Sequence, residues 1–109
     1  MPWLLRDGEV LASLEVADDW RSRSRGLLGR GEFDGAILLR PARAVHTLGM
    51  KFPIDVAYLD ADLKVIRVVS MGRWRVGRPV LRARAVLETE RGVFREWSLR
   101  PGDQLEIKE

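Results

Sequence analysis

Short runs of apolar residues, separated by turn-forming residues, make up most of the hydrophobic pattern of this chain. Two such runs, residues 3–6 and 9–16, lie on either side of Asp7 and Gly8. An Asp-Gly pair between two apolar runs is a strong hairpin signal, so we predict that these runs form two antiparallel strands. In the second run apolar and polar residues alternate, which predicts one buried face made of Val10, Ala12, Leu14 and Val16.

A helix of about three turns, close to the mean helix length, is predicted between Asp18 and Gly29. Asp18 or Asp19 can accept hydrogen bonds from the free backbone N–H groups at its start, and Gly29 suits its end. Gly26 is unfavourable inside a helix, so we expect the last turn to be irregular. The apolar side of this helix would consist of Trp20, Leu27 and Leu28.

The rest of the chain predicts short strands divided by turns, with a second short helix at residues 90–97. The expected strands cover residues 36–39, 45–48, 55–59, 63–69, 80–87 and 104–107. Because strands and helices do not alternate, a doubly wound parallel sheet is not expected. We predict a mainly β (α+β) fold with one or two short helices, arranged as a β-sandwich or a partly closed barrel. The predicted core is Val10, Leu14, Trp20, Leu27, Ile37, Leu39, Ile54, Val56, Tyr58, Val65, Val68, Val86, Leu87 and Ile107.

The composition limits the classes of protein to which this chain could belong. A chain of 109 residues with 46% hydrophobic residues is expected to form a single domain, residues 1–109, with one core. The absence of cysteine excludes disulfides, thiolate catalysis and zinc sites with cysteine ligands. No apolar stretch approaches the roughly 18 residues of a membrane helix or forms the core of a signal peptide. We therefore expect a cytoplasmic protein without a membrane partner.

Positive charge is concentrated in one segment, although the formal net charge is only +3. Residues 63–87 contain no acidic side chain, and their basic side chains are Lys64, Arg67, Arg73, Arg75, Arg78, Arg82 and Arg84. Such a segment can attract phosphate, nucleic acid or an acidic protein face. It can equally be a solvated loop that pairs with the acidic C-terminal segment. Trp74, between Arg73 and Arg75, is the best candidate for stacking on a base.

The residues that could take part in catalysis or ligand binding cluster around the single histidine. His46 could act as a general base if an acid such as Asp55 or Asp60 oriented it, or it could be a half-buried strand residue. Asp60 begins a stretch with two acids of a calcium loop, but the third acid and the glycine at the sixth position are missing. With one histidine and no cysteine, we expect no metal site.

Several segments, in order along the chain, carry a resemblance to a known family. They are Arg25-Gly26-Leu27-Leu28, Gly35–Leu39, His46–Met50, Phe52–Asp55, Tyr58–Asp60, Val86-Leu87-Glu88 and Pro101-Gly102-Asp103. Over about residues 10–108 the chain resembles domain of unknown function 192, a family of small, mainly prokaryotic domains. In this chain Leu28 stands where methionine is usual, and Gly49 where tryptophan is usual. The resemblance implies a β-rich fold with one helix near the N-terminus and no particular reaction.

The interpretation that the sequence favours is a non-enzymatic ligand-binding or accessory module, with an unknown small molecule or peptide as its partner. No catalytic residue, metal or cofactor is assigned, and the oligomeric state is not predicted. One alternative is a small hydrolase- or lyase-like enzyme that uses His46 with Asp55 or Asp60. A second is a weak nucleic-acid-binding module that uses residues 73–84. The ligand-binding residues would be His46, Met50, Asp55 and Asp60, with Arg73 and Arg75 at the rim.

Overall fold

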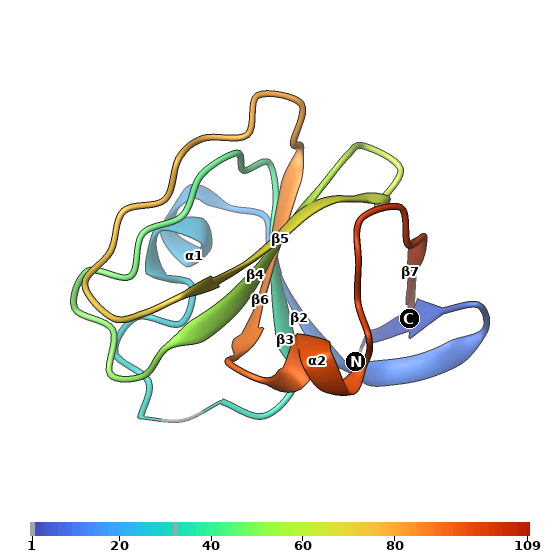
Figure 1. The fold of residues 1–109 in the computed structure, drawn as a ribbon, viewed down its shortest axis with the longest axis horizontal. Helices are drawn as coiled ribbons and strands as arrows, with labels where there is room; N and C mark the ends of the chain where they lie inside the picture. The colour runs from blue at the N-terminus through green and yellow to red at the C-terminus, as the bar shows by residue number, and fades with distance from the viewer. Residues whose placement is uncertain (1, 32) are drawn as a thin grey trace.

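The computed structural model describes residues 2–31 and 33–109, and its main element is a mixed seven-stranded sheet (Figure 1). The strands are β1 (Trp3–Arg6), β2 (Glu9–Ala17), β3 (Ala36–Leu39), β4 (Ile54–Leu59), β5 (Val65–Met71), β6 (Ala85–Glu90) and β7 (Leu105–Lys108). The helices are α1 (Trp20–Arg25) and α2 (Val93–Glu96). None of the helices in the described residues is long and apolar enough to cross a membrane.

The strand order is β5-β4-β6-β3-β2-β1-β7. Among the strands of the described residues, only β2 and β3 pair in parallel, and α1 connects them. The two outer strands approach each other at a single bridge between Lys64 and Gln104, so the described part of the sheet is not a closed barrel. The first and last strands pair with each other, which places the two chain ends side by side (Figure 1). The predicted mainly β fold with two short helices is confirmed.

The central strands β3, β4 and β6 are buried on both faces, so the sheet separates two cores. We call them the α1-side core and the α2-side core, after the helices to the left and right of the central strands in Figure 1. The α1-side core contains Leu27, Ile37, Leu39, Met50, Phe52, Ile54, Val56, Tyr58 and Val86. The α2-side core contains Leu4, Leu14, Leu38, Ala57, Leu59, Leu87, Phe94, Leu99 and Leu105.

The N-terminal hairpin forms as predicted, but its register changes within the pair. Asp7 and Gly8 have φ angles of 52° and 79°, as a two-residue turn with both central residues at positive φ requires. Leu4 pairs with Ala12 whereas Leu5 pairs with Val10, so Leu11 is an extra residue in β2. Such a bulge shifts the alternation of side chains between the two faces. Val10 is consequently 57% exposed, and its assignment to the core was wrong.

Helix α1 is shorter than predicted. The carboxylate of Asp19 accepts a hydrogen bond from the backbone N–H of Ser22 at 2.8 Å, which confirms Asp19 as the N-cap. The helix ends at Gly26, whose φ of 46° breaks the helical path, and not at Gly29. Leu27 therefore turns into the core while Trp20 stays 76% exposed, so placing Trp20 in the core was wrong. The other helix is also shorter than the predicted residues 90–97.

Residues 45–48 do not form the predicted strand. His46 makes an isolated bridge with Val76, and the neighbouring Thr47 is fully buried. The N–H of Thr47 donates to the carbonyl of Arg75 at 2.7 Å, and its hydroxyl donates to the carbonyl of Gly72 at 2.6 Å. Thr47 thus connects the 40–50 loop to the 72–84 loop, because its backbone and its side chain both form hydrogen bonds with that second loop.

The remaining strand predictions agree with the structure to within a few residues, except at the start of β6. That strand begins at Ala85 and not at residue 80, because Val80 donates to the carbonyl of Arg43 outside the sheet. Most of the predicted core is buried, which confirms it, whereas Val68 and Ile107 are only partly buried.

Truncation of a side chain in the central strands should show how much stability they carry. Leu87 is completely buried in β6, so Leu87→Ala should lower the free energy of unfolding by roughly 2–5 kcal/mol, the usual cost of this change in a core. Chemical denaturation measures this loss. Lys64→Ala, at an exposed position, serves as the control. A loss for Leu87→Ala no larger than that of the control would contradict the burial of β6.

Candidate functional site

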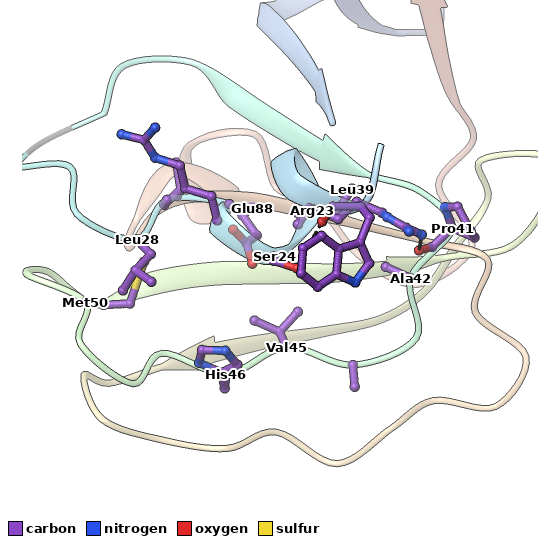
Figure 2. Close-up of a pocket in the computed structure, with 15 residues that line it drawn as sticks. Arg23, Ser24, Leu28, Leu39, Pro41, Ala42, Val45, His46, Met50 and Glu88 are labelled. Atoms are coloured by element: carbon purple, nitrogen blue, oxygen red, sulfur yellow. Dashed lines mark hydrogen bonds between the residues drawn. The ribbon is translucent and has the colours of Figure 1, made fainter. Parts of the chain in front are cut away.

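A cleft of about 390 Å³ lies on the α1 side of the sheet, between α1 and the 40–50 loop (Figure 2). Its walls are mainly apolar side chains, namely Leu27, Leu28, Leu39, Val45 and Met50. Basic and aromatic groups also line it, among them Trp20, Arg23, Arg25 and His46. Glu88 of β6 is the one acidic residue that lines the cleft. An apolar hollow with a few polar groups is the usual composition of a small-molecule site.

Glu88 is a buried acid on a central strand. It lies on the same face of β6 as Val86, and the residue is only 4% exposed. Burial raises the pKa of its carboxyl to about 7, because removal from water disfavours the charged form. The backbone N–H of Leu27 donates a hydrogen bond that acts in the opposite direction on this pKa. The salt bridges within the described residues join Arg6 to Asp103 and Arg30 to Glu15, so none of them compensates Glu88.

Gly26, at the end of α1, lies close to the carboxyl of Glu88. Gly26 has positive φ, and a Cβ atom at this position would lie 3.1 Å from Oε1 of Glu88. Any side chain would therefore press on the carboxyl and strain the backbone at the same time. Glycine lets the chain turn here and bring the N–H of Leu27 to the acid. Two segments that are far apart in the sequence, residues 25–28 and 86–88, thus meet at the cleft.

The histidine is in the cleft, but its hydrogen bonding does not prepare it as a base. His46 is exposed, and its Nδ1 accepts a hydrogen bond from the backbone N–H of Leu48 at 3.2 Å. In this arrangement the neutral ring carries its proton on Nε2, so Nε2 is a donor. Ser24 also lines the cleft, and its hydroxyl donates to the carbonyl of Trp20 within the helix. Among the described residues that line the cleft, Ser24 and His46 are therefore not hydrogen-bonded to each other as a nucleophile and its base would be.

Asp55 lies on the opposite face of the sheet from His46. In β4 the side chains of Ile54 and Val56 point to the α1-side core, so the intervening Asp55 points to the α2 side. Its carboxylate accepts hydrogen bonds from the hydroxyl of Ser70 at 2.6 Å and from the N–H groups of Gly92 at 2.9 Å and Phe94 at 3.2 Å. Asp55 therefore holds the start of α2, and the structure does not bring it together with His46 and Met50.

The other residues expected at the site also lie elsewhere. Oδ1 of Asp60 accepts hydrogen bonds from the N–H groups of Asp62 and Lys64, both at 2.9 Å, which is the role of a turn residue. Arg73 and Arg75 are exposed on the 72–84 loop and do not line the cleft. Nucleic-acid binding by that loop stays a prediction. Among residues 2–31 and 33–109, no group of three or more histidine, aspartate or glutamate side chains is placed to hold a metal ion.

Glu88 was not among the ligand-binding residues assigned from the sequence, although it ends the segment Val86-Leu87-Glu88 that carries the family resemblance. A further signal was present, because Glu88 follows the unbroken apolar run Ala85-Val86-Leu87 and is followed by Thr89. A strand without alternation is buried on both faces, so an acid at its end has no water-exposed side to occupy.

The pKa of Glu88 predicts how stability changes with pH. The folded-state pKa lies above the ordinary value of 4.5, so the folded protein binds the extra proton between pH 4.5 and about 7, and stability falls as pH rises through this window. Glu88→Gln should remove this pH dependence. It should also raise the free energy of unfolding at pH 8 by up to roughly 3 kcal/mol, which is the energy that corresponds to a pKa raised from 4.5 to about 7. Denaturant titrations at pH 4.5 and 8 measure it.

Glu90→Gln is the matched control, because Glu90 belongs to the same strand but not to the cleft. If Glu88→Gln kept the same pH dependence as the unmodified chain, another group would be responsible.

Replacement of Asp55 should separate a structural role from a binding role. Asp55→Ala leaves the buried N–H of Phe94 and two further donors without their acceptor, so we expect a loss of roughly 2–4 kcal/mol in the free energy of unfolding. His46→Ala changes an exposed residue and should stay within about 0.5 kcal/mol of the unmodified chain. Equal stability of the two variants, measured by urea denaturation, would refute the capping role.

Comparison with known proteins gives relatives over nearly the whole chain. The UPF0127 proteins of Pyrococcus horikoshii and Pyrococcus furiosus are each 29% identical to it, over 91% and 90% of this chain and 87% and 89% of their own lengths. A UPF0127 protein of Thermococcus gammatolerans is 30% identical over 83% of this chain and 63% of its own length.

Solved structures show the same fold. A protein of unknown function from Novosphingobium aromaticivorans superposes with a TM-score of 0.80 at 20% identity, covering 96% of this chain and 83% of its own. A proposed transcription regulator from Sinorhizobium meliloti gives 0.79 at 21% identity, covering 97% and 91%. The sequence model of DUF192, described as "Uncharacterized ACR", matches residues 4–107, and the chain therefore belongs to the DUF192 family.

Proposed function

We propose that this chain is a ligand-binding module whose cleft on the α1 side takes a small molecule, or the end of a peptide, with an apolar body and one amine group. The observation that carries the proposal is Glu88, an acid that is 4% exposed, lines the cleft and has no cationic partner in the described residues. A buried carboxylate without a counter-charge is costly, and a bound cation removes this cost.

The walls of the cleft suit an apolar ligand body. Leu27, Leu39 and Met50 line the cleft but are themselves almost fully buried, so most of the apolar area that a ligand would cover belongs to the more exposed Leu28 and Trp20. Removal of apolar area from water contributes about 25 cal/mol per Å². The amine would then fix the orientation of the ligand in the cleft, because Glu88 is the one acidic side chain among the described residues that line it. We expect the apolar part to determine affinity and the amine to determine orientation.

The charges on α1 restrict which amines fit. Arg23 donates to the carbonyl of Pro41 at 2.9 Å and to that of Asp19 at 3.3 Å, so its guanidinium is held on the α1 side (Figure 2). Arg25 also lines the cleft. Two arginines beside the cleft disfavour a second cationic group on the ligand. The ligand we propose therefore carries a single positive charge.

Titration with simple amphipathic molecules tests this function. Hexylamine should bind saturably, with NMR shifts at Gly26, Leu28 and Met50, whereas hexanol and 1,6-diaminohexane should bind more weakly. Below pH 7 the affinity for hexylamine should fall by up to about tenfold per pH unit, because protonation of Glu88 removes its charge.

The same titration with Glu88→Gln should lose most of the preference for hexylamine over hexanol, while Glu90→Gln should keep it. If hexanol bound the unmodified chain as tightly as hexylamine, the acid would have no role in recognition. If shifts appeared only on the α2 side, the cleft would not be the binding site.

A further inference from the structure

We propose a second binding site, on the α2 side of the sheet: the free edge of β5 accepts an acidic peptide in extended conformation as an additional strand. β5 is the last strand at one end of the sheet. Its first residue is covered, because the N–H of Val65 donates to Asp103 and its carbonyl accepts from Gly102. Beyond Val65, residues 66–71 pair only with β4 among the described residues, so one row of backbone groups has no strand beside it.

A groove lies beside the open edge of β5. A hollow of about 770 Å³ lies between β5 and the segment 91–100, and Val68, Val69 and Ser70 of β5 form one side of it. Phe94 and Leu99 line the other side but are nearly fully buried, whereas Val68 and Val69 are partly exposed. The groove therefore offers open strand hydrogen bonds beside apolar contacts from β5, which are the two components of strand addition to a sheet edge.

The charge around this edge is positive. Arg91, Arg95 and Arg100 line the groove, are exposed, and take part in neither of the salt bridges found in residues 2–31 and 33–109. An adjoining hollow of about 380 Å³ shares Val69 and Ser70 with the groove. Its basic residues are Arg67, Arg75 and Arg78, which are likewise exposed and outside both salt bridges.

Asp55 is the one acid that lines either hollow, and its oxygens already accept three hydrogen bonds. Among the described residues, no other acidic side chain lines these hollows to offset the arginines on the two sides of the edge. Carboxylates are the side chains that arginine pairs with most specifically, through two parallel hydrogen bonds. A strand with acidic residues would form backbone hydrogen bonds with the open edge of β5 and ion pairs with the arginines beside it.

Other occupants fit less well. Antiparallel pairing of two β5 edges from two copies would bring one set of arginines against the other, and like charges directly opposed are destabilising. A nucleic acid would match the charge, but Phe94 is 3% exposed and cannot stack on bases, and the exposed Trp74 lines neither hollow. The charge, the open edge and the absence of an exposed aromatic ring among the described residues that line the two hollows together favour an acidic peptide.

The test uses a short, end-blocked peptide of alternating glutamate and threonine, titrated into the full chain. We expect saturable binding, with amide shifts in residues 66–71. Two versions of the peptide, N-methylated on alternate residues in opposite phases, should differ strongly, because only one edge of an added strand bonds to β5. Arg95→Glu combined with Arg100→Glu should weaken binding by about tenfold or more. Arg82→Glu, an exposed arginine that lines neither hollow, should change it little.

Three results would overturn the proposal. Equal binding of the two N-methylated peptides would show charge attraction without strand addition. Shifts confined to residues outside 66–71, 75–78 and 91–100 would place the peptide elsewhere. Tighter binding of a single-stranded oligothymidine than of the peptide would make the arginine surface a nucleic-acid site. None of these results depends on the cleft, which is on the opposite side of the sheet.

Discussion

The central strands β3, β4 and β6 have no face in contact with water, and the rest of the molecule follows from this constraint. Each face needs a cover, so α1 with the 40–50 and 72–84 loops encloses one core, and α2 with the outer strands encloses the other. Each polar side chain on these strands must find its partner inside the protein. Asp55 accepts hydrogen bonds from Ser70 of β5 and from two N–H groups at the start of α2. Among the described residues, the carboxyl of Glu88 has one backbone N–H, that of Leu27, acting on it. The two acids thus differ in role: one fixes the start of a helix, and the other remains without a counter-charge at the candidate cleft.

Local signals in the sequence were sufficient for much of the fold. The pair Asp7-Gly8 specifies its turn through positive φ angles, and Asp19 caps its helix by a contact three residues away. Features that depend on distant partners were not predictable in the same way. The bulge at Leu11 shows only in the pairing of β1 with β2. Residues 45–48 have the composition of a strand but no neighbouring strand, because Thr47 joins two loops instead.

The candidate site was less predictable, because it depends on which face of the sheet each residue occupies. His46 and Met50, which the sequence predicted as ligand-binding residues, both line the cleft. Proximity in sequence placed Asp55 beside them, although strand alternation sends it to the other face. Glu88 is 42 positions from His46 in sequence, and only the strand order brings β6 beneath α1. A pattern of residues along the chain indicates burial, but it does not identify the segment that covers a buried group.

Helix α1 forms one wall of the cleft without burying any residue of its own. It is held at its ends, by the cap at Asp19 and the turn at Gly26, and by the contact of Arg23 with Pro41. Since most folding free energy comes from buried apolar area, side chains along α1 contribute little to the stability of the sheet. Evolution can therefore vary this wall almost independently of the scaffold. Substitutions along α1 can thus reshape the cleft while the strands and the buried acid beneath it remain equally well folded.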